Sequence, residues 1–243
     1  MAVRNSIAQR PQQNDKVVEY KCGEEIVKLS PSIIRNYLVS GNGNVTDQEI
    51  GMFLNLCRFQ HLNPFLREAY LIKFGNQPAT IVTGKEAITK RAMRNPKYVG
   101  QQAGIVIYHE DSGELEYRNG SLQMKDEQLV GGWAKVYVKG YEVPIEASVS
   151  FDEYVGRKSD GTIHDQWRKK PATMIRKVAL VQALREAFPE DLGGMYASEE
   201  MGLDFDETAA SAPVEVSQEP AQPETETPPW ETPAPVDELP GDF

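Results

Sequence analysis

Apolar residues recur along this chain first with the spacing of helices, then with that of strands, and finally with that of helices again. Ser30-Pro31 combines a cap with a first-turn proline, which predicts a short helix through Leu38 that ends in the turn Gly41-Asn42-Gly43. Thr46-Asp47-Gln48-Glu49 has the form of a capping box. The apolar residues that follow it lie on one face and predict a core-facing helix: Ile50, Phe53, Leu54 and Cys57.

The middle of the chain has the alternating pattern of strands. Thr83-Gly84-Lys85-Glu86 resembles a second capping box and predicts a helix to about Arg94. A turn is expected at Asp111-Ser112-Gly113, and a hairpin about Lys139-Gly140. Helices, then strands, then helices predict an α+β fold with a mostly antiparallel sheet packed with helices. The strands are expected at 68–74, 78–82, 98–109, 115–118, 133–138 and 142–150.

A long helix is expected from Pro171 to about Phe188, after a polar loop at 156–166 and before a short helix near Met195–Met201. Its apolar face contains Arg185. A buried guanidinium needs an anionic partner, because a desolvated unpaired charge costs several kcal/mol. That partner is either a carboxylate of the protein or a phosphate of a ligand.

An aromatic residue and three cations precede this helix: Trp167, Arg168, Lys169 and Lys170. The helix N-terminus carries partial positive charge and free N–H groups, so it attracts the same kind of ligand, an anion. Three cations at a turn are often only solvated. With Trp167 beside them as a surface for base stacking, we favour nucleic-acid backbone as the ligand. Phe65, Tyr98 and Trp133 are expected in the core instead.

The helix expected after Thr83 carries a second cationic face, formed by Lys90, Arg91 and Arg94 and continued by Lys85. Such a face alone is typical of a solvated helix. Together with Lys97 and Arg168–Lys170, it is predicted to form one wall of a groove for single-stranded nucleic acid.

The net charge hides an asymmetry that bears on this prediction. The whole chain has a net charge of −10, which argues against a nucleic-acid ligand. However, residues 199–243 contain thirteen Asp and Glu and no Lys or Arg. Residues 1–198 therefore hold 26 Lys and Arg against 23 Asp and Glu, a net charge of +3. A mildly basic body carries a strongly acidic tail.

Composition also predicts the domain organisation. Residues 1–15 are expected to be a flexible arm, residues 16–203 one DNA-binding and oligomerisation domain, and residues 204–243 a disordered acidic tail rich in proline. Two cysteines indicate a reduced, cytoplasmic protein. The apolar runs are shorter than the ~18 residues that a membrane span needs, so no membrane association is expected.

Enzyme chemistry finds little support in the sequence. Gly84-Lys85 does not form a phosphate-binding loop, because Gly75 lies nine positions earlier and Glu86 replaces the metal-binding hydroxyl. The three histidines are isolated, without Cys or His at ligand spacing. We therefore expect neither a catalytic residue, nor a metal, nor a cofactor.

Two blocks of the chain resemble the phage recombination protein Bet (Red-beta) family, relatives of the RecT annealing proteins. The first block is Leu62-Asn63-Pro64-Phe65 with Arg67-Glu68-Ala69-Tyr70 and the unit around Gly84. The second contains Trp167, Pro171, Met174, Arg176, Ala179, Gln182, Arg185 and Ala187-Phe188, followed by Gly194-Met195-Tyr196. The resemblance covers about residues 30–200.

The resemblance implies an ATP-independent single-strand annealing protein with a fold similar to the Rad-type annealing proteins. It also implies a homo-oligomer, a ring or helical filament, that holds single-stranded DNA and the annealed duplex intermediate in a basic groove. A single-strand-binding or replication accessory protein without annealing activity is the alternative. The DNA-binding residues expected are Lys85, Lys90, Arg91, Arg94, Trp167, Arg168, Lys169, Lys170, Arg176, Lys177, Gln182 and Arg185.

The chain departs from the family in two places. Ala172 and Val178 replace two lysines of the family's DNA-contacting helix, whereas Arg168–Lys170 add charge upstream of it. An acidic tail takes the place of a small helical partner-binding domain. Its last residues, Asp242 and Phe243, resemble the acidic tip of bacterial single-strand-binding proteins. The tail either solubilises the protein, binds a host single-strand-binding or replication protein, or competes with DNA for the groove.

Overall fold

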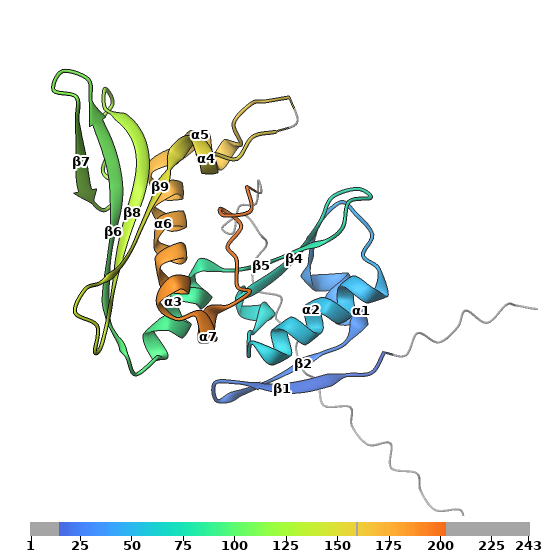
Figure 1. Cartoon of the computed structure of the whole chain (residues 1–243). Coiled ribbons are helices and arrows are strands. Elements are labelled where there is room, and N and C mark those ends of the chain that lie inside the picture. The colour runs from blue at the N-terminus through green and yellow to red at the C-terminus, as the bar shows by residue number, and fades with distance from the viewer. Residues whose placement is uncertain (1–14, 159, 203–243) are drawn as a thin grey trace, which may run out of the picture.

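The structure, a computed structural model, describes residues 15–158 and 160–202. In this part of the chain three sheets and several helices form an α+β architecture with mostly antiparallel pairing (Figure 1). The elements are β1 (Val18–Cys22), β2 (Glu25–Leu29), α1 (Pro31–Ile33), a π-helical turn (Ile34–Leu38), β3 (Val39–Gly41), α2 (Asp47–Phe59), a 3₁₀ turn (Pro64–Leu66), β4 (Ala69–Lys73), β5 (Thr80–Thr83), α3 (Lys85–Arg94), β6 (Tyr98–His109), β7 (Glu114–Asn119), β8 (Gln128–Val138), β9 (Ile145–Ser150), α4 (Phe151–Tyr154), α5 (Asp165–Lys169), α6 (Pro171–Ala187) and α7 (Pro189–Leu192).

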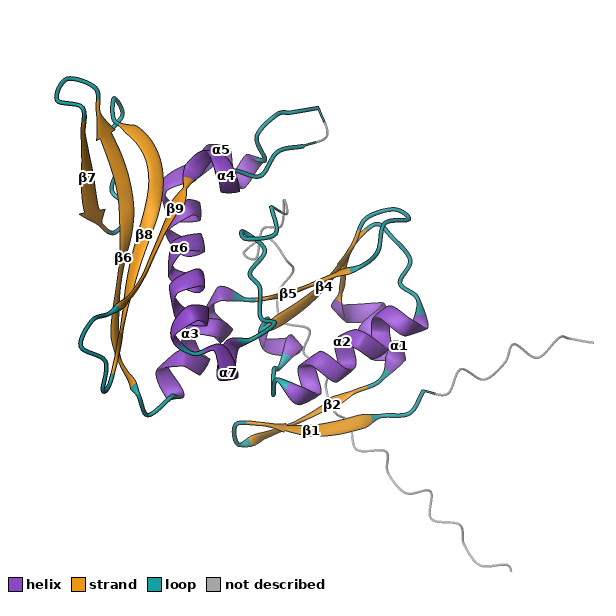
Figure 2. Cartoon of the chain, in the orientation of Figure 1, coloured by secondary structure: helices purple, strands orange, loops and turns teal. Residues whose placement is uncertain are grey.

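The largest sheet is antiparallel throughout, with the strand order β7-β6-β8-β9. Helix α6 packs along one of its faces, as Figure 2 shows, and contacts β6, β8 and β9. Alternate residues of the central strands therefore point at α6 and are fully buried, among them Ile105, Ile107 and Val136. The other face of this sheet carries Tyr117 and Trp133, whose rings meet edge to face with centroids 6.5 Å apart.

The N-terminal half contributes two smaller sheets. β1 and β2 form a hairpin, and β3-β4-β5 form a sheet in which β3 runs parallel to β4. Helix α2 begins with the expected capping box. The Thr46 hydroxyl accepts from the Glu49 N–H, and the Glu49 carboxylate accepts from the Thr46 N–H. Glu49 also pairs with Lys73 at 2.6 Å, and these hydrogen bonds hold the pKa of Glu49 at about 2.

Helix α6 is apolar on almost every side and is buried accordingly. Besides the sheet, it contacts α3, α5 and α7. Its approach to the sheet is closest at Gly132 of β8, where an added Cβ would lie 2.6 Å from the carbonyl oxygen of Ile175. The missing side chain thus lets the backbone of α6 lie directly on the strand. The residues of α6 that are buried are Ala172, Met174, Ile175, Val178, Ala179, Leu180, Val181, Ala183 and Leu184.

After α7 the chain returns between the two halves of the molecule as a strap, which we define as residues 193–202 (Figure 1). The strap is held on one side by the Thr83 N–H at the end of β5, which donates to the Tyr196 carbonyl at 2.8 Å. On the other side, Met195, Ala197 and Ser198 are buried in the core. The strap therefore joins the N-terminal sheet to the α6 layer.

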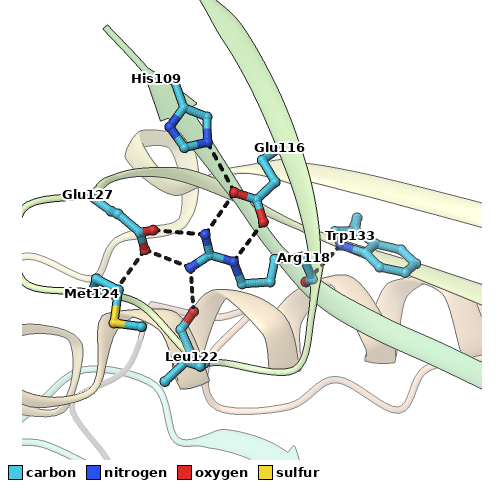
Figure 3. Close-up of polar contacts among 7 residues, drawn as sticks. All are labelled: His109, Glu116, Arg118, Leu122, Met124, Glu127 and Trp133. Carbon is cyan, nitrogen blue, oxygen red and sulfur yellow. Dashed lines mark hydrogen bonds and ion pairs between the residues drawn. The ribbon is translucent and has the colours of Figure 1, made fainter. Parts of the chain in front are cut away.

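At the far end of the large sheet a charged network replaces the apolar core. The Arg118 guanidinium binds the carboxylates of Glu116 and Glu127, each through two nitrogen–oxygen contacts of 2.7–2.8 Å (Figure 3). Arg118 also donates to the Leu122 carbonyl, and Glu127 accepts from the Met124 N–H. The guanidinium and the His109 ring keep the pKa of Glu116 at about 2. The network fixes the loop between β7 and β8.

The α+β fold, the strand positions and the long helix expected from the sequence are confirmed. Two local expectations are wrong. Thr83 does not cap α3, because its side chain is buried in β5 and Gly84 is the N-cap residue. Residues 195–201 are not helical, since 195–197 have no regular structure and 198–202 form turns, and the short helix lies earlier, at α7. The tail assigned to residues 204–243 and the N-terminal arm, except Asp15, lie outside the described residues. None of the described helices has the length and apolar character that a membrane crossing requires.

We predict that Gly132→Ala lowers the free energy of unfolding by about 1–3 kcal/mol, because the added methyl group forces α6 away from β8. Gly100→Ala on the neighbouring strand is the control, since no atom lies within 4 Å of its added Cβ. Chemical denaturation of both variants checks the prediction. Equal stabilities would show that the close approach is not a constraint.

Candidate nucleic-acid interface

The cations ahead of α6 lie on the short helix α5 and on the residue that links it to α6. Arg168 pairs with Asp165 one turn earlier, at 2.9 Å, and both side chains are exposed. Lys169 and Lys170 are exposed, and neither side chain has an ion pair in the described part of the chain. Pro171 then occupies the first turn of α6, as expected. Exposed cations without carboxylate partners stand at the N-terminus of a 17-residue helix, which is a favourable place for an anion.

Trp167 is not the exposed stacking surface that the sequence suggested. Its side chain is 1% exposed and packs edge to face on Phe151, with centroids 5.8 Å apart. Helix α5 has only five residues, and burying its one large aromatic side chain is what attaches it to the core. The indole Nε1 is buried without a hydrogen-bond partner among the described residues. Trp167 therefore orients the cations beside it in this structure.

A second group of cations lies where α3 meets the middle of α6. Arg176 donates from Nε to the Ala103 carbonyl at 3.1 Å, and Lys177 pairs with Glu199 of the strap at 2.7 Å. Lys85 is half-buried beside them. Burial lowers the pKa of Lys85, and the positive charges of Arg176 and Lys177 lower it further. Three of the predicted site residues, Lys85, Arg176 and Lys177, are thus brought together, and Lys177 is paired with the buried carboxylate of Glu199.

The structure gives Arg185 an internal carboxylate as its partner. Its guanidinium binds both oxygens of Glu200, at 2.6 and 3.0 Å, and donates to the Met195 carbonyl. The Tyr196 ring lies 4.4 Å from the guanidinium carbon. The hydrogen bonds to Glu200 raise the pKa of Arg185 against the effect of burial. Of the two partners expected for Arg185, the protein supplies the carboxylate. Gln182, one helical turn earlier, is half-buried with its side-chain oxygen unpaired among the described residues.

The α3 cations lie apart from those of α5. In Figure 1, α5 is at the N-terminal end of α6, whereas α3 lies near its C-terminal end. Lys90 pairs with Glu68 at 2.8 Å, and Arg91 donates to the Gln60 carbonyl. Arg94 is exposed at the last turn of α3. These three side chains therefore face the N-terminal half, and Lys85 lies between them and the α6 cations.

Three features of this surface were not found from the sequence. The carboxylates of Glu199 and Glu200 come from a segment that was expected to be helical, and the β1–β2 hairpin was not expected at all. No group of acidic, His or Cys side chains in the described ranges is arranged to hold a metal ion. Asp242 and Phe243 lie outside the described residues.

We predict that Arg185→Ala lowers the free energy of unfolding by about 3 kcal/mol, because the buried Glu200 carboxylate loses its partner. Arg185→Lys is expected to recover only part of this loss, since an ammonium lacks the two-pronged guanidinium geometry. Arg168→Ala, which breaks an exposed pair, is the control and should change stability by less than about 1 kcal/mol. Full stability of Arg185→Ala, together with lost DNA binding, would assign Arg185 to the ligand.

Comparison with known proteins agrees with the two blocks of resemblance. The chain is 31% identical over 137 residues to an uncharacterized protein, UU154, of Ureaplasma parvum serovar 3 (strain ATCC 700970). The match covers 56% of this chain and 52% of that protein, so the chain spans about half the length of this relative. The model of the RecT family matches residues 24–215, which include β2 to α7 and the strap. The chain belongs to the RecT family.

Proposed function

We propose that the protein anneals complementary single strands of DNA without ATP, by binding their phosphates along a line of cations and leaving the bases free to pair. Membership of the RecT family supports this activity and a role in recombination. Contacts to phosphate carry no sequence preference, which suits a protein that must accept any pair of complementary strands. Base pairing between the strands supplies the free energy.

The observation that carries the proposal is the excess of positive charge along α5, α6 and the start of α3. From Asp165 to Arg185 the chain has six cations and one carboxylate, and the strap adds the carboxylates of Glu199 and Glu200, which pair with Lys177 and Arg185. Packing of α3 against α6 then adds Lys85 to Arg176 and Lys177. Burial lowers the pKa of Lys85 most, and Arg176 and Lys177 lower it further, so Lys85 lies close to two other positive charges, and such a cluster attracts phosphate. The proposed contacts are therefore Lys169, Lys170, Arg168, Lys85, Arg176 and Lys177.

The charge of the large sheet also favours a DNA path along the cations of α5, α6 and the start of α3. Residues 98–150, which form that sheet, hold four Lys and Arg against eight Asp and Glu. Residues 15–97 hold twelve against eight. A polyanion is therefore repelled by the sheet and attracted to the side of α6 that faces the N-terminal half. We further propose that the protein works as a homo-oligomer, a ring or a helical filament, so that neighbouring protomers continue one DNA path.

Annealing itself is tested with complementary oligonucleotides mixed with the full-length protein in the absence of ATP and divalent metal. We expect pairing to be faster than in the protein-free reaction. Binding of the single strands with no acceleration of pairing would support the accessory single-strand-binding function instead. Absence of both would contradict the proposal.

The triple variant Arg168→Ala, Lys169→Ala, Lys170→Ala is predicted to bind all sequences more weakly. Each phosphate contact on a single strand contributes about 0.7 to the slope of log affinity against log salt. The slope of the variant should therefore be smaller by up to about 2. Anisotropy titrations of a labelled oligonucleotide over a range of salt measure it. An unchanged slope would remove these cations from the DNA path.

Lys85 is predicted to make the DNA affinity depend on pH in the alkaline range. Because its pKa is lowered, Lys85 loses its proton at a lower pH than an ordinary lysine, and a neutral amine no longer binds phosphate. DNA affinity should therefore fall as the pH rises toward that lowered pKa. Lys85→Arg should keep its affinity over the same pH range, because a guanidinium stays charged. Identical pH profiles of the two proteins would contradict a contact between Lys85 and phosphate.

A further inference from the structure

A cationic pocket of about 370 Å³ lies between the tip of the β1–β2 hairpin, the end of α2 and the outer side of α3. We call it the hairpin pocket. Four of the side chains that line it are cationic, Lys21, Lys90, Arg91 and Arg94, against one carboxylate, that of Glu68. Its volume is within the range of ligand sites, about 300–1,000 Å³. Its excess of positive charge indicates an anionic ligand.

Two of the four cations have protein partners and form the wall of the pocket. Lys90 balances the charge of Glu68, whose carboxylate also accepts from the Asn63 N–H, and these contacts lower the pKa of Glu68 despite its burial. Arg91 donates to the Gln60 carbonyl. The single carboxylate of the lining is therefore already neutralised, and it leaves the charge of the other cations uncompensated.

Lys21 and Arg94 are the two cations that remain available. Both are exposed, and in the ranges that the structure describes neither side chain makes an ion pair or hydrogen bond. They come from opposite sides of the pocket, Lys21 from β1 and Arg94 from the last turn of α3. The hairpin turn lies next to Arg94. A Cβ added to Gly23, whose φ is +63°, would lie 3.8 Å from a terminal nitrogen of Arg94.

The hairpin is fixed at this place by three hydrogen bonds to His61 and Leu62, just after the end of α2. The Tyr20 hydroxyl donates to the Leu62 carbonyl at 2.6 Å, and the Cys22 thiol donates to the His61 carbonyl. The His61 ring in turn binds the Lys21 carbonyl at 2.8 Å. The backbone that carries Lys21 is therefore positioned before any ligand arrives, which lowers the entropic cost of binding.

We propose that the hairpin pocket binds a phosphate group of single-stranded DNA between Lys21 and Arg94. The guanidinium of Arg94 can bind two phosphate oxygens, and the ammonium of Lys21 adds a second charge from the facing side. The site rests on the proposed function and extends it. Lys85 and Arg94 are nine residues apart on α3, about 14 Å along the helix axis, so a strand that contacts both follows α3 away from α6.

The double variant Lys21→Gln, Arg94→Gln of the full-length protein tests the site. At low salt we expect its affinity for a thymidine oligonucleotide to fall about tenfold. The slope of log affinity against log salt should fall by about 0.7, the contribution of one phosphate. Because neither side chain has a partner that would be orphaned, the melting temperature should stay unchanged.

The matched control is Lys16→Gln, Lys139→Gln, which removes two exposed charges that have no ion pair in the described ranges, one just ahead of the hairpin and one after β8, and neither lines the pocket. The control should keep the salt slope of the parent protein. If both double variants behave alike, the hairpin pocket is not a phosphate site.

Oligonucleotides with and without a 5′-phosphate distinguish the source of the phosphate. An equal loss with both identifies a phosphodiester within the strand, and a loss only with the phosphorylated strand identifies its terminal phosphate. Either loss supports the pocket. Binding is measured on one strand alone, so a failure of annealing would contradict the proposed function and leave this result intact.

Discussion

A helix that is apolar on almost every side must be covered on every side, and α6 imposes this constraint on the whole fold. The large sheet covers one side, while α3, α7 and the strap cover the others. The charged ends of cationic side chains on such a helix need partners where they reach the edge of the packed core. Arg176 finds a carbonyl, and Lys177 and Arg185 find Glu199 and Glu200 of the strap. Packing of α6 therefore pairs the cations within the helix. Lys169 and Lys170, just before its first turn, keep exposed side chains without an ion pair in the described ranges.

Elements whose stability follows from local pattern were predictable, and those that depend on distant contacts were not. The capping box at Thr46, the strands of the large sheet and the proline start of α6 each have a local signature, and each is confirmed. Thr83-Gly84-Lys85-Glu86 has the same signature as a cap, but burial of the Thr83 side chain in β5 removed the cap. The strap has no periodic pattern, because its position depends on Thr83, Lys177 and Arg185, which are remote in sequence.

The candidate site shows the same division. Sequence identified the cationic residue types and the helices that carry them, since charge and helical spacing are local properties. It did not show which carboxylate each cation meets, because Glu68 and Glu200 approach from other parts of the chain. It also placed Trp167 in solvent, although the cost of exposing a large aromatic favours the core. Lys21 was overlooked although the sequence carries a strand signal there, because Val18, Tyr20 and Cys22 alternate with charged residues ahead of the turn at Gly23-Glu24.

The late position of α6 in the chain has a consequence for how the protein is made. During synthesis the strands of the large sheet and the apolar side of α3, with Ile88, leave the ribosome before the helix that covers them. At about 5–20 residues per second, these surfaces stay uncovered for several seconds until α6 and the strap have emerged. A chaperone that shields apolar strands would act in this interval. A chain that stops short of the strap would leave Arg185 and Lys177 without carboxylates, and premature termination should therefore yield misfolded protein in place of a smaller working one.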